Sequence, residues 1–251
     1  NFITLLLIQV SVKSGEGQYA FEGFRPHEAL KLGGAHCPAP VVMLFDARDI
    51  LTRQTTQFSD GNLAAANPDV GDDAAFLSRI PFEKVYHSTA LPDDSSKGNI
   101  LYHRHAEVII PGEVDLSALR IIGCRSQAEY ETLRHMLNPE ARKRWSNVMA
   151  LGNTRYLHFK NWTFIDQVDL TDDLITIRFN PSTWTPGPFT IKATVKDLAT
   201  RRYIWEQTGY KAAGDQQIRL TLRDKKEYWI EIKLDGRVAY ANYYSKIEKP
   251  L

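Results

Sequence analysis

The chain has 251 residues, of which 43% are hydrophobic and 24% are charged, as is ordinary for a globular protein with a packed core. The formal net charge is +1, which excludes a global field that recruits polyanions, so any contact with nucleic acid must come from local basic clusters. The two cysteines, Cys37 and Cys124, fit no metal-binding spacing, and we expect both to be reduced thiols in a cytoplasmic protein.

The first part of the chain mixes strand and helix signals. The apolar run 3–12 is too short to span a bilayer and lacks the basic leader of a signal peptide, so we expect a buried strand there. Residues 40–45 predict a second buried strand, and Asp46 is the expected N-cap of a short helix that ends at Leu51. The segment 58–62 contains Ser-Asp-Gly, which is typical of a turn.

The later elements of this part are predicted from turn residues, apolar runs and capping patterns. In chain order they are a polar loop at 91–99, a strand at 107–110, a helical turn at 115–119, a strand at 120–124, a helix from Ser126 to about residue 137 and a helix from Pro139 to about residue 151.

The pattern becomes all-β beyond residue 154. Apolar runs of strand length occupy 156–159, 174–179, 189–195, 203–205, 218–222, 228–232 and 238–241. Asp235-Gly236, between the last two runs, predicts a tight hairpin. Such a series of short strands suggests an immunoglobulin-like sandwich. We therefore predict an α+β chain, with a mixed domain over residues 1–152 and an all-β sandwich over residues 153–251.

Aromatic residues of this second part leave two interpretations open. They either form a binding face or pack in the core and along the sheet edges. The residues concerned are Trp162, Trp184, Trp205, Tyr243 and Tyr244.

The candidate catalytic group is a carboxylate at the mouth of a strand. Glu107 precedes the β-branched run 108–110 and follows two imidazoles and a guanidinium within 102–105. Neighbouring cations favour the ionised form of a carboxylate, and desolvation opposes it. Two interpretations of Glu107 are open. It is a functional carboxylate, which orients a ribose hydroxyl or stabilises a developing positive charge, or it is an ordinary surface glutamate at a strand start.

Three blocks of the first part resemble the DarT family, the DNA ADP-ribosyltransferase toxins of bacterial toxin–antitoxin and phage-defence systems. Residues 40–51 are similar to the family's apolar strand and following helix, and 58–64 to its aromatic-(Thr/Ser)-Asp-Gly segment. The third block begins at residues 104–111, which resemble the family's basic-X-Ala-Glu strand, and continues at 116–123, which resemble the run that closes its domain. The likeness covers residues 20–137, and the order of the blocks makes the combination more specific than any single one.

The resemblance implies an ADP-ribosyltransferase-like split β-sheet domain in which Glu107 is the catalytic glutamate. It implies transfer of ADP-ribose from NAD, as a co-substrate, to a base in single-stranded DNA or RNA, without a metal. Arg25 is the best match to the family's NAD-binding arginine, and the alternative is an exposed arginine before a proline turn.

The resemblance also places Tyr102, His103, Arg104 and His105 against the nucleic acid, where rings stack on bases and donors reach phosphates. The alternative for His103 and His105 is a pair of solvated loop imidazoles. The basic run 142–144 is either a solvated helix face or a track for phosphates.

The expected protein is a cytoplasmic toxin held by an antitoxin protein, with no membrane contact. The alternative is a catalytically degenerate module that docks a partner protein or nucleic acid. The family's opening His-Thr-type element has no match here, so we expect that it lies upstream of Asn1 or has diverged. A nuclease or glycosidase is less favoured, because no second carboxylate accompanies Glu107 convincingly.

Overall fold

The computed structural model describes residues 41–63, 65, 67–87, 89–112, 116–151, 163–183, 186–197, 202–212, 216–223 and 226–246, together with the backbone of Leu5–Leu7. The chain divides into two compact units. The first unit comprises Asn1–Ile8 and Leu44–Arg120, and the second comprises Gln9–Met43 and Ile121–Leu251. Helices and strands form several small sheets, so the chain has the α+β class expected from the sequence.

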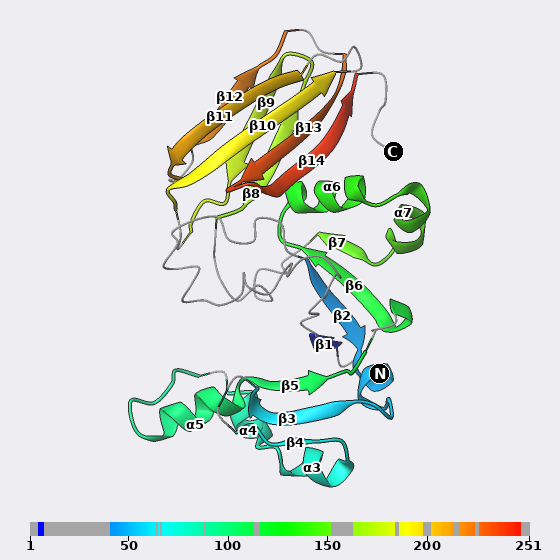
Figure 1. Ribbon diagram of the computed structural model, residues 1–251, viewed down its shortest axis with the longest axis vertical. Coiled ribbons are helices and arrows are strands. Elements are labelled where there is room, and N and C mark those ends of the chain that lie inside the picture. Colours follow the sequence, from blue (N-terminus) through cyan, green and yellow to red (C-terminus); the bar gives the residue numbers. More distant parts are fainter. Residues whose placement is uncertain are drawn as a thin grey trace. The chain divides into compact units, whose positions relative to one another are not determined.

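The first 124 residues hold short strands and short helices (Figure 1). In chain order they are β1 (Leu5–Leu7), β2 (Val42–Asp46), α2 (Ala47–Leu51), β3 (Gln57–Asn62), β4 (Val70–Gly71), α3 (Ala74–Arg79), α4 (Phe82–Val85), α5 (Ser96–His103), β5 (Ala106–Ile109), the 3-10 turn η2 (Leu116–Ala118) and β6 (Leu119–Cys124).

The remaining elements are two helices and eight strands of the described residues. They are α6 (Gln127–Met136), α7 (Pro139–Trp145), β7 (Met149–Leu151), β8 (Ile165–Leu170), β9 (Leu174–Phe179), β10 (Phe189–Asp197), β11 (Arg202–Tyr210), β12 (Gln217–Thr221), β13 (Glu227–Leu234) and β14 (Arg237–Ser245).

The first unit contains the three-stranded antiparallel sheet β4-β3-β5. Phe58 on β3 forms a small core with Phe76 and Ile80, and Val108 on β5 packs against it. Helix α3 begins where the carboxylate of Asp73 accepts a hydrogen bond from the N–H of Phe76, which satisfies one free donor of the first turn. This sheet carries Glu107.

Local signals placed several elements correctly. Asp46 caps α2 by accepting from the N–H groups of Arg48 and Asp49. Ser126 caps α6 through the N–H of Glu129, as its capping pattern predicted. Both motifs depend on residues within three positions of one another, so a sequence is enough to identify them.

Three predictions of local structure were wrong. Residues 58–62 belong to strand β3 and not to a turn, because they lie between the nearby strand β4 and strand β5, which comes from far along the chain. The segment 91–99 is not all loop, since α5 begins at Ser96. The helix that starts at Pro139 ends at Trp145 instead of about residue 151, because 149–151 pair in parallel with β6.

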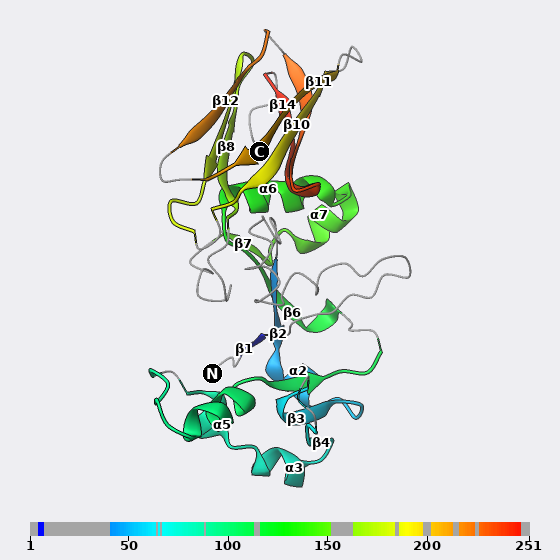
Figure 2. The same cartoon turned by 60° about the vertical axis from the view of Figure 1, so that its left-hand side comes forward.

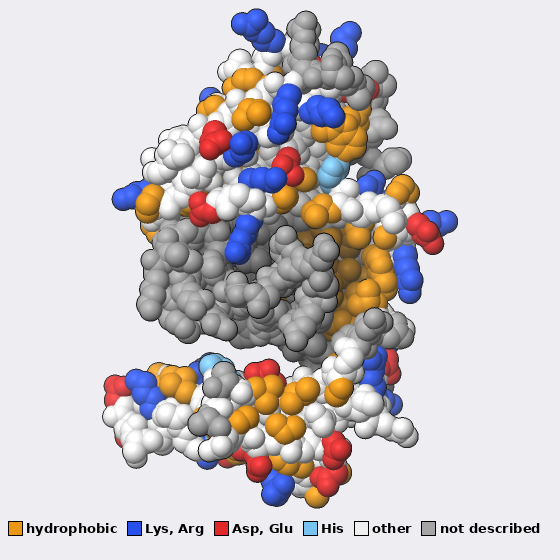
Figure 3. Space-filling model, viewed as in Figure 1, with side chains coloured by type: hydrophobic (Ala, Val, Ile, Leu, Met, Phe, Trp, Pro, Cys, Tyr) orange, Lys and Arg blue, Asp and Glu red, His pale blue; other side chains and the backbone are white. Residues whose placement is uncertain are grey.

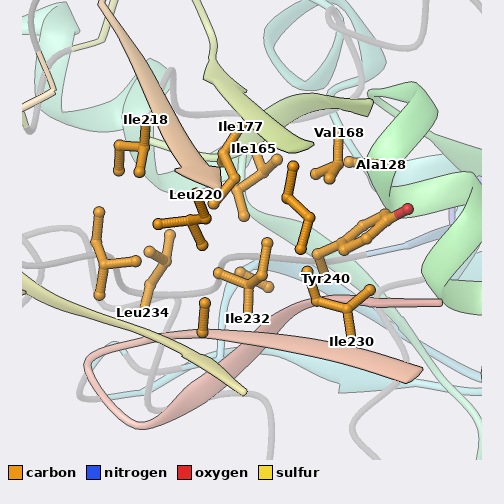
Figure 4. Packing of buried hydrophobic residues seen from close by; sticks show 14 of the residues in the cluster. Ala128, Ile165, Val168, Ile177, Ile218, Leu220, Ile230, Ile232, Leu234 and Tyr240 are labelled. Carbon is orange, nitrogen blue, oxygen red and sulfur yellow. The ribbon is translucent and has the colours of Figure 1, made fainter. Parts of the chain in front are cut away.

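The second unit contains seven antiparallel strands in two sheets, ordered β11-β10-β13-β14 and β12-β9-β8. Figure 2 shows the sheets as separate layers. Their inner faces share one core, to which β9 and β12 contribute Ile177 and Leu220, and β13 contributes Ile230 and Ile232 (Figure 4). Alternate residues of β13 are buried, as expected of half-buried strands.

The two sheets together, β8 to β14, are called the layered region below. The predicted strands match six of its seven strands. The hairpin between β13 and β14 turns at Asp235 and Gly236, whose positive φ angles of 46° and 78° confirm the Asp-Gly prediction. Strand β8 was missed, because an irregularity in its pairing with β9 breaks the period-two pattern that marks a strand. The strand predicted at 156–159 lies outside the described residues.

Helix α6 packs on the layered region of the same unit. The hydroxyl of Thr132 accepts a hydrogen bond from the N–H of Ala241 on β14, at 3.1 Å. The Tyr240 hydroxyl donates to Glu131 at 2.8 Å. The second unit thus groups residues 121–151 with the seven strands; the division at 152/153 stays a prediction.

Two observations bear on the remaining sequence-based expectations. Cys124 is a buried thiol that forms no disulfide with a described residue, and burial raises its pKa to about 12, so it is a poor nucleophile at neutral pH. Cys37 lies outside the described residues. In the part of the chain that the structure describes, no helix is long and apolar enough to cross a membrane.

Candidate active site

Strand β5 places Glu107 on the face of its sheet opposite the small core. Successive side chains of a strand point to opposite faces. Val108 packs against the small core formed by Phe58, Phe76 and Ile80, and Glu107 beside it is exposed. Among the described residues, no lysine or arginine forms an ion pair with Glu107. The strand therefore presents to the solvent side a carboxylate that has no lysine or arginine partner among the described residues.

A bulge in the neighbouring strand fixes the backbone of Glu107. Phe58 pairs with Val108 and Asn62 with Ala106, so three residues of β3 face the single residue Glu107. The buried Ser59 hydroxyl replaces the missing ladder bond: it accepts from the N–H of Glu107 at 2.8 Å and donates to the carbonyl of Gly61 at 2.7 Å. Ser59 thereby holds β5 against the bulge.

Asp60 ties the end of α5 to the same bulge. Its carboxylate accepts from the Tyr102 hydroxyl at 2.6 Å, and its carbonyl accepts from His103 Nδ1 at 2.6 Å. Because a carbonyl only accepts, Nδ1 of His103 carries the proton, and Nε2 is left to accept from the Asn99 amide at 3.4 Å. The hydrogen bond to Asp60 raises the pKa of Tyr102, so its hydroxyl stays protonated.

The glycine of the Ser-Asp-Gly segment is required by a close approach. A Cβ at Gly61 would lie 2.3 Å from Cε1 of Tyr102, so the tyrosine ring covers this backbone directly. The segment was predicted to set a turn; its role in the structure is to form the bulge on which Tyr102 and His103 rest.

Two opposing effects set the ionisation of Glu107. Burial of part of the carboxyl raises its pKa above the usual value of 4.5. The charge of His105 and a hydrogen bond from the N–H of Leu63 act in the other direction. The net shift is upward, as is common for functional carboxylates.

The residues predicted to contact substrate divide into two pairs. Tyr102 and His103 are half-buried and bound to Asp60, whereas Arg104 and His105 are exposed in the turn between α5 and β5. Arg25 lies outside the described residues. In the described part of the chain, no group of three or more His, Cys, Asp or Glu side chains could hold a metal ion.

Sequence reasoning missed Ser59 and Asp60 as organisers of the site. Ser59 acts on Glu107 across 48 positions of sequence, and no local pattern reports such a contact. The available signal was the proximity of a small hydroxyl residue to Asp-Gly, which we interpreted as turn chemistry.

One of three comparisons with known proteins found a match. The model of the family described as "ssDNA thymidine ADP-ribosyltransferase, DarT" matches residues 28–156, just over half of the 251 residues. The chain belongs to the DarT family. Membership implies ADP-ribosyl transfer to single-stranded DNA, and the matched segment contains Glu107 and the β3 bulge but not Arg25. Searches of curated proteins and of solved structures found no match.

Proposed function

We propose that this chain transfers ADP-ribose from NAD to a base of single-stranded DNA, with Glu107 as the catalytic carboxylate. The observation that carries the proposal is the exposed glutamate on β5, which forms no ion pair with a described lysine or arginine and lies inside the segment matched by the family. Of the two acceptors considered from the sequence, the family's description favours DNA over RNA.

The chemistry requires an anion beside the ribose. Breaking the bond between nicotinamide and ribose builds positive charge on the sugar, and a fixed carboxylate stabilises that charge most strongly in the transition state. The freed electron pair leaves with nicotinamide, a nitrogen or oxygen of the base forms the new bond to the sugar carbon, and Glu107 accepts the proton that the base loses. The bond from Ser59 to the backbone of Glu107 supports this role by limiting the movement of the strand.

The basic residues beside Glu107 suit a nucleic-acid strand. We assign Arg104 and His105 to phosphate contacts, because both are exposed at the start of β5. Tyr102 and His103 keep partly exposed rings while bound to Asp60, and contact of these rings with a base remains a prediction. Arg25 remains our candidate for the NAD diphosphate, on the basis of the sequence alone.

The wider biological role follows from the family resemblance. An enzyme that modifies DNA in its own cell needs a partner that restrains it, so we propose a cytoplasmic toxin with an antitoxin protein. For the second unit we propose an immunoglobulin-like sandwich, supported by seven antiparallel strands in two sheets over one core.

The decisive experiment measures transfer of labelled ADP-ribose to a single-stranded oligonucleotide. We expect Glu107→Gln to lower the rate by at least about 100-fold, because it removes the charge and keeps the shape of the side chain. The matched control is Glu83→Gln, which removes an exposed carboxylate on α4 of the same unit and should leave the rate unchanged.

Mass spectrometry of mixed DNA and RNA oligonucleotides incubated with NAD identifies the acceptor base in the same assay. Equal rates for Glu107→Gln and wild type would remove the catalytic assignment. A folded wild-type chain that labels no oligonucleotide would favour the degenerate binding module.

A further inference from the structure

The second unit has an open groove outside the site described above. Its volume is about 860 Å³, and its walls come from α6, α7, β8, β13 and β14. Figure 3 shows a face of this unit on which hydrophobic side chains and a histidine lie close to lysine and arginine side chains. A groove with both aromatic and cationic walls differs from an ordinary apolar crevice, and its composition indicates what it can bind.

Three aromatic rings, each tilted against the next, form a continuous cluster along one wall. Trp229 lies 4.9 Å from His135 and 4.6 Å from Tyr243, measured between ring centroids. Trp229 is 45% exposed, whereas its neighbours on β13, Tyr228 and Ile230, are buried. A large apolar side chain is thus left partly open to solvent. Burial, aided by Arg142, lowers the pKa of His135, so this ring is neutral at pH 7. The exposed part of Trp229 offers a ring face to a planar ligand.

Two arginines line the same groove as these rings, and Arg142 is held in position by hydrogen bonds. Arg142 donates from Nε to the carbonyl of Arg134 at 2.9 Å and from Nη2 to the carbonyl of Leu137 at 3.2 Å. Arg134 lies with its guanidinium 5.9 Å from the ring centre of Tyr130 and is exposed. Lys143 and Arg144 follow on α7 and add two more cations to this helix.

The carboxylates that line the groove are already engaged. Glu131 accepts from the Tyr240 hydroxyl and from the amides of Asn242 and Gln127. Asp169 forms an ion pair with Arg178. The groove therefore pairs flat aromatic faces with cations that have no carboxylate partner among the described residues, and this combination matches single-stranded nucleic acid, whose bases stack and whose phosphates carry charge.

We propose that this groove binds a stretch of single-stranded DNA, with bases stacked on Trp229 and Tyr243 and phosphates beside Arg134 and Arg142. The DNA partner, as opposed to another nucleic acid, rests on the proposed function. The site would hold nucleotides other than the one that is modified. Stacking accepts any base, so the groove contributes affinity without sequence choice.

The test measures the Kd of the full chain for labelled single-stranded DNA of about 16 nucleotides, in the absence of NAD, by fluorescence anisotropy. We expect Trp229→Ala to raise Kd about tenfold. The matched control is Tyr203→Ala, which removes an aromatic side chain of 42% exposure on β11 and should leave Kd unchanged.

A second variant keeps the proposal testable if Trp229→Ala does not fold. Arg134→Ala should lower the slope of log Kd against log salt concentration by about 0.7, the value for one lost phosphate contact on a single strand. Its control is Arg219→Ala, an exposed arginine on β12. An unchanged salt slope for Arg134→Ala, or an unchanged Kd for folded Trp229→Ala, overturns the proposal.

The outcome is separate from that of the catalytic proposal. If the wild type labels no DNA and the Trp229→Ala variant binds DNA more weakly than the wild type, the groove stands and the enzyme assignment fails. If Glu107→Gln abolishes labelling while Trp229→Ala leaves Kd unchanged, the enzyme stands and the groove fails. Weaker binding of a co-expressed antitoxin by Trp229→Ala, with DNA binding intact, would make the groove a protein interface.

Discussion

The charge on Glu107 controls its proposed chemistry, because only the ionised carboxylate can stabilise a cationic sugar. Burial raises the pKa of Glu107 above 4.5, and the charge of His105 opposes the rise. The protonated, inactive form therefore persists to a higher pH than for a free glutamate. Transfer should fall as the pH drops through this raised pKa and should be constant above it.

We expect His105→Ala to move the acid limb of the rate profile to higher pH. Removing a neighbouring positive charge makes the ionised form of Glu107 less favourable, so its pKa rises further. The measurement is kcat/KM against pH with saturating NAD. Lys84→Ala removes a cation of the same unit that does not act on Glu107 and should leave the midpoint in place; a downward shift for His105→Ala would contradict the electrostatic account.

Single residues were predictable where the chemistry was local. The place of Glu107 on a strand was predicted correctly, because a carboxylate before a β-branched run is visible in sequence; its catalytic role stays a prediction. The contact of Ser59 was not predicted, because its bond to Glu107 joins two strands and the bulge that requires it has no local signature. Trp229 was overlooked as an exposed ring, although the alternation of β13, with Tyr228 and Ile230 inward, was enough to turn it outward.

At the scale of elements, the bulge of β3 is the feature that positions the site. It leaves the N–H of Glu107 without a ladder partner, and the Ser59 hydroxyl supplies one. Helix α5 is fastened to the same bulge through Asp60. A change in the bulge should therefore alter catalysis without removing any group that we expect to touch substrate.

Ser59→Ala tests this positioning role. The substitution leaves the partly buried N–H of Glu107 without its acceptor, which costs about 1–3 kcal/mol of unfolding free energy. We expect kcat to fall while KM for NAD changes little, and amide exchange at Glu107 to accelerate. Ser59→Thr keeps the hydroxyl and should recover most of the rate.

The control for this variant is Ser78→Ala, which removes an exposed hydroxyl on α3 that bonds only to the carbonyl of Ala75 among the described residues. Its effect on stability should stay within about 0.5 kcal/mol. If Ser59→Ala lowers stability but leaves kcat intact, the serine supports the fold and not the reaction.

The same distinction between local and distant causes applies to the elements. Helices α2 and α6 were predictable because their capping residues lie within one turn. Strand β7 was not predictable, because residues 149–151 become a strand only by parallel pairing with β6. Strands β9 to β14 were predictable from alternation, whereas the irregular register of β8 concealed it.

For the whole molecule, the family's extent and the compact units do not coincide. The family match runs to residue 156, yet α6 and α7, which it includes, belong to the unit of the seven strands. Helix α6 contacts both β8 and β14. Helix α6 and the layered region should therefore unfold together.

A buried ion pair at the start of α6 gives a way to test this coupling. Arg125 and Glu129 have side chains only 3% and 1% exposed. Glu129 accepts from Nε and from the backbone N–H of Arg125, at 2.8 Å each. Arg125 also lies 4.2 Å above the ring of Phe164, and Ser126 donates to the carbonyl of Ile165 at 2.8 Å. The pair thus joins α6 to the segment that enters β8.

We expect Glu129→Gln to lower the unfolding free energy of the second unit by about 3 kcal/mol, because Arg125 stays buried without its counter-charge. Hydrogen exchange is the measurement: amides of α6, β8 and β14 should lose protection together, while those of β3 and β5 keep theirs. Glu140→Gln, an exposed change on α7, is the control. If α6 loses protection while β8 and β14 keep theirs, the helix does not fold as part of the layered region.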